Sequence, residues 1–146
     1  MAEAGTTGGP PITITTRYLA SKTPGLPALV LQVTELVDSY MVWVGISDGG
    51  PEVKERTAAQ GQLCRDWAVA MPPRPPVTES SATSLFRPPS SDVALSMAQR
   101  LAKRFKKQIF LSVDIPPSAL GFGQGPGLVL EAERGVVERL SELEKQ

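Results

Sequence analysis

Residues 40–46 read Tyr-Met-Val-Trp-Val-Gly-Ile, and this run decides how the rest of the chain is interpreted. The run is rich in β-branched and aromatic residues and has apolar side chains at both odd and even positions. Since successive side chains of a strand point to opposite faces, the pattern predicts a strand covered on both sides. The segment from Leu29 to Val37 repeats with a period of two, and Asp38-Ser39 can form a turn, so the two runs predict an antiparallel hairpin.

Three further strands are predicted from the same period. They are residues 12–18, residues 65–71 with Trp67, Val69 and Met71 on one face, and residues 109–113. The second of these ends at residues 72–76, because proline has no amide hydrogen to donate to a sheet. Residues 128–130 predict a short last strand.

The segments between these strands predict loops and two main helices. Residues 47–63 are expected to form an exposed loop with a short helical turn, and residues 77–91 and 118–127 two more surface loops. The first main helix follows Ser90 or Ser91, either of which can cap it, with Asp92 at the positive end of the helix dipole. Its apolar residues recur at helical spacing, as do those of a second helix from Glu131 to about Glu144. The two stripes are Ala94, Met97, Ala98, Leu101 and Phe105, and Ala132, Val136, Leu140 and Leu143.

The order of elements indicates an α+β fold: an antiparallel, β-sandwich-like sheet with two main helices in a single domain. A chain of 146 residues is long enough for one domain with a real core. Residues 1–11 are rich in glycine, threonine and proline and are expected to be a disordered tail. The domain is therefore expected over residues 12–146.

Composition excludes several classes of function. The chain contains no histidine, which removes Ser-His-Asp and Cys-His catalysis and most zinc sites. Fifteen basic and fifteen acidic residues cancel, so no overall field favours nucleic acid or an anionic membrane. Cys64 is the single cysteine, which fits a reducing compartment. We expect no catalytic, cofactor or metal site, and neither an apolar leader region nor a membrane span is recognisable.

One local charge concentration is a candidate for contact with a partner protein. Arg100, Lys103, Arg104 and Lys107 lie on the polar side of the first main helix or just after it. A basic helix can bind an acidic protein surface, although such a run is more often a solvated outer face. Nucleic acid is disfavoured because no aromatic residues interleave for base stacking. A glycine-rich segment at 121–127 matches no phosphate-binding motif and is interpreted as a connector.

Several stretches of the chain resemble the proteasome assembly chaperone 4 family. The Trp-Val-Gly and Ala-Gln-Arg-Leu-Ala segments and their spacing are the most specific, and the resemblance covers roughly residues 28–145. The stretches are DSYMVWVG at 38–45, residues 63–71 ending in WAVAM, SMAQRLAKR at 96–104, KQIFLS at 107–112 and LVLE at 128–131. The N-terminal extension and the loops at 47–63, 72–90 and 118–127 depart from the family pattern.

The resemblance implies a function in assembly rather than catalysis. Members of the family are expected to form a heterodimer with a chaperone 3-like subunit and to assist formation of the proteasome α-ring in the 20S core particle. The implied partners are that subunit and proteasome α-type subunits, in the cytoplasm or nucleus, and the family has no catalytic residues to transfer. A generic heterodimerising scaffold or adaptor outside proteasome assembly is the alternative, and a minor enzyme that uses Cys64 or carboxylates is a second rival.

Overall fold

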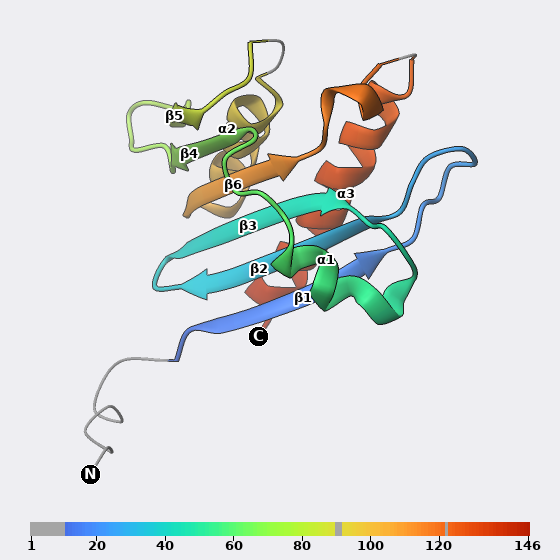
Figure 1. The fold of residues 1–146 in the computed structure, drawn as a ribbon. Helices are drawn as coiled ribbons and strands as arrows, with labels where there is room; N and C mark the ends of the chain where they lie inside the picture. Colours follow the sequence, from blue (N-terminus) through green and yellow to red (C-terminus); the bar gives the residue numbers. More distant parts are fainter. Residues whose placement is uncertain (1–10, 90–91, 122) are drawn as a thin grey trace.

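The computed structural model describes residues 11–89, 92–121 and 123–146. In these residues six strands form one sheet, with helices on both of its faces (Figure 1). The predicted tail falls almost entirely on residues 1–10, which lie outside the described residues. Pro11, the last residue of the predicted tail, is exposed and belongs to neither a helix nor a strand.

The sheet has the order β1-β2-β3-β6-β4-β5. Neighbouring strands are antiparallel except β3 and β6, which run parallel. The α+β class is confirmed, and the described strands belong to a single sheet rather than to two sheets packed face to face. The strands are β1 (Thr13–Leu19), β2 (Leu29–Leu36), β3 (Ser39–Ile46), β4 (Trp67–Met71), β5 (Ser81–Phe86) and β6 (Gln108–Asp114).

The predicted hairpin of β2 and β3 is confirmed, with Leu36 paired to Ser39 across the turn. Asp38 has a φ of 53°, a left-handed conformation that aspartate tolerates better than most residues. In the order of the sheet, β3 lies near the centre, between β2 and β6.

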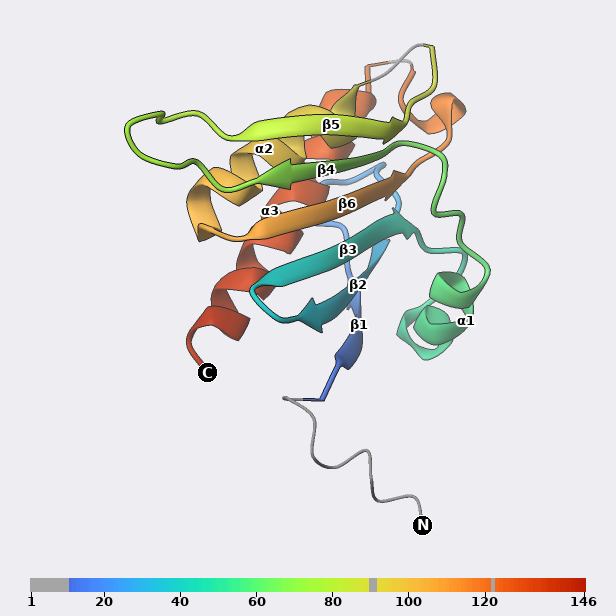
Figure 2. The same cartoon turned by 90° about the vertical axis from the view of Figure 1, so that its left-hand side faces the viewer.

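The helices divide unequally between the two faces of the sheet (Figures 1 and 2). We call the face covered by α2 and α3 the inner face, and the face that carries α1 the outer face. The helix α1 lies over β1, β2 and β3, at one end of the outer face. The helical segments are η2 (Pro51–Val53), α1 (Lys54–Ala59), α2 (Val93–Phe105), η3 (Pro117–Ala119) and α3 (Gly125–Glu144).

The hydrophobic core lies between the inner face and the two long helices. Alternate residues of β2, β3 and β6 such as Leu31, Val42 and Leu111 are fully buried there. The predicted apolar stripes of both helices pack against them, and all of their members are buried except Phe105, which is half-buried. The helical period therefore identified correctly the sides of α2 and α3 that build the core.

Two sequence predictions are wrong, namely the loop over residues 81–86 and the strand over residues 128–130. The predicted start of the last helix is displaced. Residues 81–86 form the edge strand β5 within the segment expected to be a loop. Residues 128–130 belong to α3, because Leu128 continues the buried stripe of that helix four residues before Ala132. The helix begins at Gly125, inside the loop predicted at residues 118–127. The N-cap position of α2 is Asp92, whereas Ser90 and Ser91 lie outside the described residues.

Candidate partner-binding site

The outer face carries a continuous line of side chains that crosses all six strands. Strand pairing places one residue of each strand in register with the next: Ile14 with Thr34, Thr34 with Met41, Met41 with Phe110, Phe110 with Val69, and Val69 with Thr83. Four of the six are large apolar residues and two are threonines. We call these six residues the outer row.

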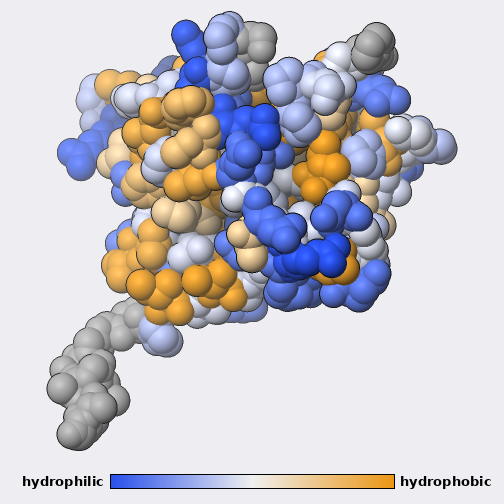
Figure 3. Space-filling view, in the orientation of Figure 1, coloured by the Kyte–Doolittle hydropathy of each residue, from blue (hydrophilic) through white to orange (hydrophobic). Residues whose placement is uncertain are grey.

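The outer row begins at an exposed side chain, Ile14, and is flanked by two other apolar side chains that reach solvent. Ile14 is 60% exposed, Met71 beside Val69 is 43% exposed, and Phe86 at the end of β5 is 51% exposed. Figure 3 shows the outer face, with hydrophobic surface over β4, β5 and β6 and over the start of β1, separated from the hydrophilic surface of α1. Apolar surface of this kind on a small domain is typical of a protein-binding site.

Residues 47–65, which include α1 and are called the α1 segment here, cover only the part of the outer face beside the outer row. Trp43 is 9% exposed, and its Nε1 donates a hydrogen bond to the carbonyl of Gln62 (3.3 Å). Gly61 lies so close to the Trp43 ring that an added Cβ would be 2.3 Å from Cζ2. The central strand is thus covered on both faces at Trp43, as its sequence predicts, but its Met41 lies in the open part.

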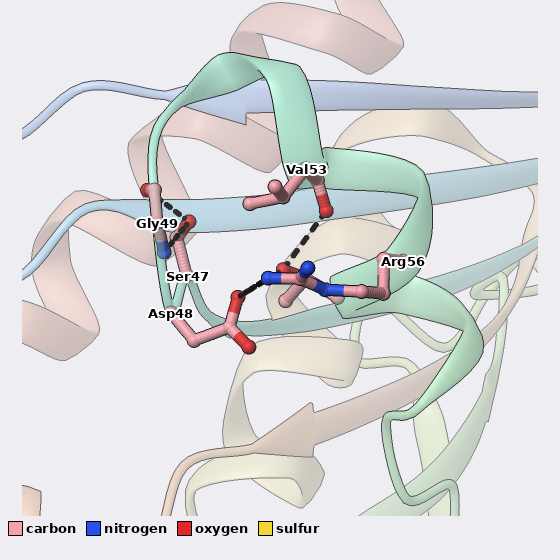
Figure 4. A network of polar contacts seen from close by, with 6 residues as sticks. Ser47, Asp48, Gly49, Val53 and Arg56 are labelled. Carbon is pink, nitrogen blue, oxygen red and sulfur yellow. Dashed lines mark hydrogen bonds and ion pairs between the residues drawn. The ribbon is translucent and has the colours of Figure 1, made fainter.

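Polar contacts hold the α1 segment in place (Figure 4). The Thr57 hydroxyl donates to Asp48 (2.8 Å), and Arg56 lies 3.7 Å from the same carboxylate. The Thr57 hydrogen bond, and then the charge of Arg56, lower the pKa of Asp48. The Ser47 hydroxyl also closes a tight turn with the backbone of Gly49. Since these contacts lie at the start of the segment, they fix how α1 enters over the sheet.

The end of the same segment is fixed to β6. Asp114 accepts hydrogen bonds from the Arg65 side chain (2.7 Å) and from the backbone amide of Gln62 (2.6 Å). The buried Ser112 hydroxyl donates to the carbonyl of Leu63 (2.7 Å). The α1 segment therefore forms a fixed wall beside the outer row.

The four predicted partner-binding residues are largely engaged within the chain. Arg100 makes two hydrogen bonds to Glu133 of α3 (2.9 and 2.7 Å), which raise the pKa of its guanidinium further. Lys103 pairs with Glu79 at 3.3 Å. Arg104 lies 5.8 Å from the ring of the neighbouring Phe105 and forms no ion pair with any described residue.

Lys107, the fourth predicted residue, belongs to a cluster at the end of α3. Its Nζ lies 2.7 Å from Glu144 and 5.2 Å from the centre of the Tyr40 ring, and the Tyr40 hydroxyl donates to the same carboxylate. Hydrogen bonds from Lys107 and then from Tyr40 lower the pKa of Glu144. Burial, and then the bond to Glu144, raise the pKa of Tyr40. This cluster connects β3, β6 and the end of α3, so Lys107 has a structural role.

Cysteine and the acidic residues are the remaining candidates for chemistry among the described residues. Cys64 is a free, exposed thiol in the loop before β4. Within the described ranges, no group of three or more aspartates, glutamates or cysteines is arranged to hold a metal ion. In the same ranges, no helix has both the length and the hydropathy needed to span a membrane.

A groove of about 560 Å³ lies between the end of β1 and α3. Its lining includes charges of both signs, namely Lys22, Glu131, Arg134 and Glu138. None of the four is in an ion pair with another described residue. The pairing of Arg134 with Glu138 that their i,i+4 spacing suggests is therefore not formed. Charged residues are depleted in the cores of protein interfaces, so this groove fits a hydrated surface better than a closed interface.

The fold and its open apolar face define a small α+β protein-interaction domain. A family model of proteasome assembly chaperone 4 matches residues 28–115. Because the match spans more than half of the chain, the protein belongs to the proteasome assembly chaperone 4 family, and its functional class is that of a proteasome assembly chaperone.

A solved structure supports the same fold. A chain from a crystal structure of a chaperone complex for yeast 20S proteasome assembly matches with a TM-score of 0.57 and 14% sequence identity. The match covers 92% of this chain and 95% of that chain. Comparison with curated protein sequences finds no match. At 14% identity the structural likeness establishes the fold.

Sequence reasoning missed the outer row as a candidate site. The signal was present, because β3 and β6 are apolar at both odd and even positions, and one set of these residues has to face away from the core. What the sequence lacked was the order of the strands. Only the pairing of β6 with both β3 and β4 places Met41, Phe110 and Val69 side by side.

Proposed function

We propose that the chain is one half of a heterodimer with a chaperone 3-like subunit, and that the pair assists α-ring formation during assembly of the 20S core particle. Membership of the family supports the assembly function. The observation that carries the heterodimer is the outer row, a largely apolar line across the sheet that α1 borders at Thr34 and Met41 and leaves open over β4, β5 and β6. We assign the outer row as the surface that meets the chaperone partner.

The proposed interface follows from the unequal coverage of the sheet. Open apolar surface is an aggregation liability in a small domain, and a partner that covers it removes that liability. A standard protein interface buries roughly 1,200–2,000 Å² in total, which a second sheet of similar size could supply. The exposed outer-row residue Ile14 and the flanking residues Met71 and Phe86 would then be buried at the interface.

Co-expression with a chaperone 3-like protein tests the heterodimer. We expect a stable one-to-one complex in size-exclusion chromatography with mass determination, and a homodimer or a poorly soluble product when the chain is expressed alone. Met71→Lys should weaken the complex, because it places a charge on the outer face beside Val69. The matched control is Leu130→Lys on α3, since Leu130 is exposed to a similar extent (48%). Equal binding by both variants, or a wild-type monomer whose melting temperature the partner leaves unchanged, would contradict the proposal.

Co-purification followed by mass spectrometry tests the client. We expect proteasome α-type subunits to be recovered with the heterodimer from cells in which core particles are being assembled. Recovery of the chaperone partner without any α subunit would instead favour the alternative of a generic heterodimerising scaffold or adaptor.

We further propose that the basic residues Arg100, Lys103, Arg104 and Lys107 contact an acidic surface of a partner protein. Arg104 is the most informative of the four, because it forms no ion pair with the described residues and its change leaves the intramolecular pairs intact. Arg104→Glu should weaken binding of that partner protein at low salt and have little effect on it at high salt. Unchanged binding at low salt would assign this face to solvent.

We also propose that the protein acts in the cytoplasm and nucleus. The single, unpaired cysteine supports a reducing compartment. Fluorescence microscopy of a tagged chain tests this, and a signal confined to a secretory compartment would overturn it.

A further inference from the structure

A hollow of about 150 Å³ lies on the outer face, between the α1 segment and the sheet. Trp43 and Met41 of β3 and the two β2 residues Gln32 and Thr34 line its sheet side. On the other side Ala58 of α1, Gly61 and Leu63 form its wall. Its lining is thus mixed, with the apolar side chains of Met41, Trp43, Ala58 and Leu63 beside Gln32 and Thr34, and Leu63 is 37% exposed.

The chain cannot close this hollow by moving its wall inward. Asp114 holds the backbone of Gln62 and the side chain of Arg65, and Ser112 holds the carbonyl of Leu63. On the sheet side, Trp43 is pressed between Gly45 and Gly61, where an added Cβ would lie 2.5 and 2.3 Å from its ring. The hollow is therefore bounded by fixed backbone and a fixed ring.

The hollow is continuous with the outer row. Thr34 and Met41 belong to both. A partner surface that packs on the outer row would therefore also contact the opening of the hollow. Gln32, the most polar group in the lining, already has its amide bonded to Thr16 (3.3 Å). A hydrocarbon group that enters would therefore leave the Gln32 amide nitrogen hydrogen-bonded to Thr16.

We infer that this hollow is a socket for one leucine-, methionine- or phenylalanine-sized side chain of the chaperone partner. The inference rests on the proposed heterodimer. A cavity of about 150 Å³ lined by apolar side chains accepts a group the size of benzene. Binding energy at protein interfaces concentrates on a few apolar anchors that fill well-formed pockets. The socket therefore gives the chaperone partner a fixed position beside α1, in addition to the flat contact along the outer row.

Filling the socket from within the chain tests the inference. Ala58→Trp places a large ring in the hollow, and Ala59→Trp places the same ring on the exposed side of the same helix. The dissociation constant for a purified chaperone 3-like subunit is measured by calorimetry for the wild type and both variants, together with their melting temperatures. We expect Ala58→Trp to bind at least tenfold more weakly than Ala59→Trp, with similar melting temperatures for the two.

The outcomes separate the socket from the heterodimer itself. If the wild type binds and both variants bind equally well, the socket is overturned and the heterodimer stands. If the wild type fails to bind the chaperone 3-like subunit, the heterodimer and the socket are both overturned. Should Ala58→Trp fold poorly, Leu63→Asp replaces it, because Leu63 is already partly exposed at the rim; binding within twofold of the wild type would then overturn the socket.

Discussion

The ion pair between Arg100 and Glu133 is expected to stabilise the packing of α2 against α3. The two side chains make a bidentate contact, with N–O distances of 2.9 and 2.7 Å. The Arg100 side chain is 54% exposed, whereas that of Glu133 is only 21% exposed. The geometry is therefore better than that of a typical surface pair, although solvent still screens it.

The magnitude follows from this geometry. Exposed ion pairs contribute about 0.2–1 kcal/mol, and bidentate pairs with a partly buried partner lie at the upper end. We expect a coupling energy of about 0.5–1 kcal/mol between the two side chains. For a domain of this size, a loss of 1 kcal/mol lowers the melting temperature by about 2–4 °C.

A double-mutant cycle in urea measures the coupling, with Arg100→Ala, Glu133→Ala and the double variant. The chain offers a matched control in Lys103 and Glu79, which make a single 3.3 Å contact and have side chains 50% and 80% exposed. We expect the control pair to couple by about 0.2 kcal/mol or less, and the coupling of the first pair to fall in 1 M salt. A control coupling equal to or larger than that of Arg100 and Glu133 would refute the reasoning.

Three further predictions concern single residues. Cys64→Ser should leave partner binding and stability unchanged, because the thiol is exposed and unpaired; a stably folded variant that has lost assembly activity would contradict this. Glu144→Gln should remove a stabilising contribution that is present above the ordinary glutamate pKa of 4.5 and is lost as pH falls through the lowered folded-state pKa. Urea midpoints should then show a difference from the wild type at pH 7 that shrinks towards pH 3, and a difference independent of pH would count against the assignment. Lys106→Gly should raise stability by about 1 kcal/mol, because Lys106 ends α2 with a φ of 59° that glycine adopts without cost. Thermal unfolding checks this against Lys145→Gly, where φ is −84° and no gain is expected.

Local patterns in the sequence determined most of the elements and both helical contributions to the core. The period of two located β1, β2, β4 and β6, the apolar run at residues 40–46 located β3, and the helical period located the buried stripes of α2 and α3. These assignments succeed because the side-chain direction depends on the residue's own backbone conformation. The absence of histidine likewise excludes histidine-dependent catalysis on composition alone, since no fold can supply a side chain that the chain lacks.

Edge strand β5 and the start of α3 depended on contacts that the sequence does not display. The serine- and threonine-rich residues 81–86 have weak alternation, and pairing with β4 makes them a strand. Gly125 begins α3 where a Cβ would lie 2.4 Å from the carbonyl oxygen of Leu120, so the approach of another backbone selects this glycine. A similar case is Gly135, which weakens a helix in isolation but here makes room for Leu19.

The candidate site was decided by tertiary structure. The sequence showed that residues 40–46 need cover on both faces whereas the two main helices offer one apolar stripe each, and it placed the basic residues on or just after one helix. Strand order then brought Met41, Phe110 and Val69 into one row, and α3 and the loop between β4 and β5 supplied the acidic partners of Arg100 and Lys103. Both results come from segments far apart in the chain, and a local periodicity carries no information about which distant segments meet.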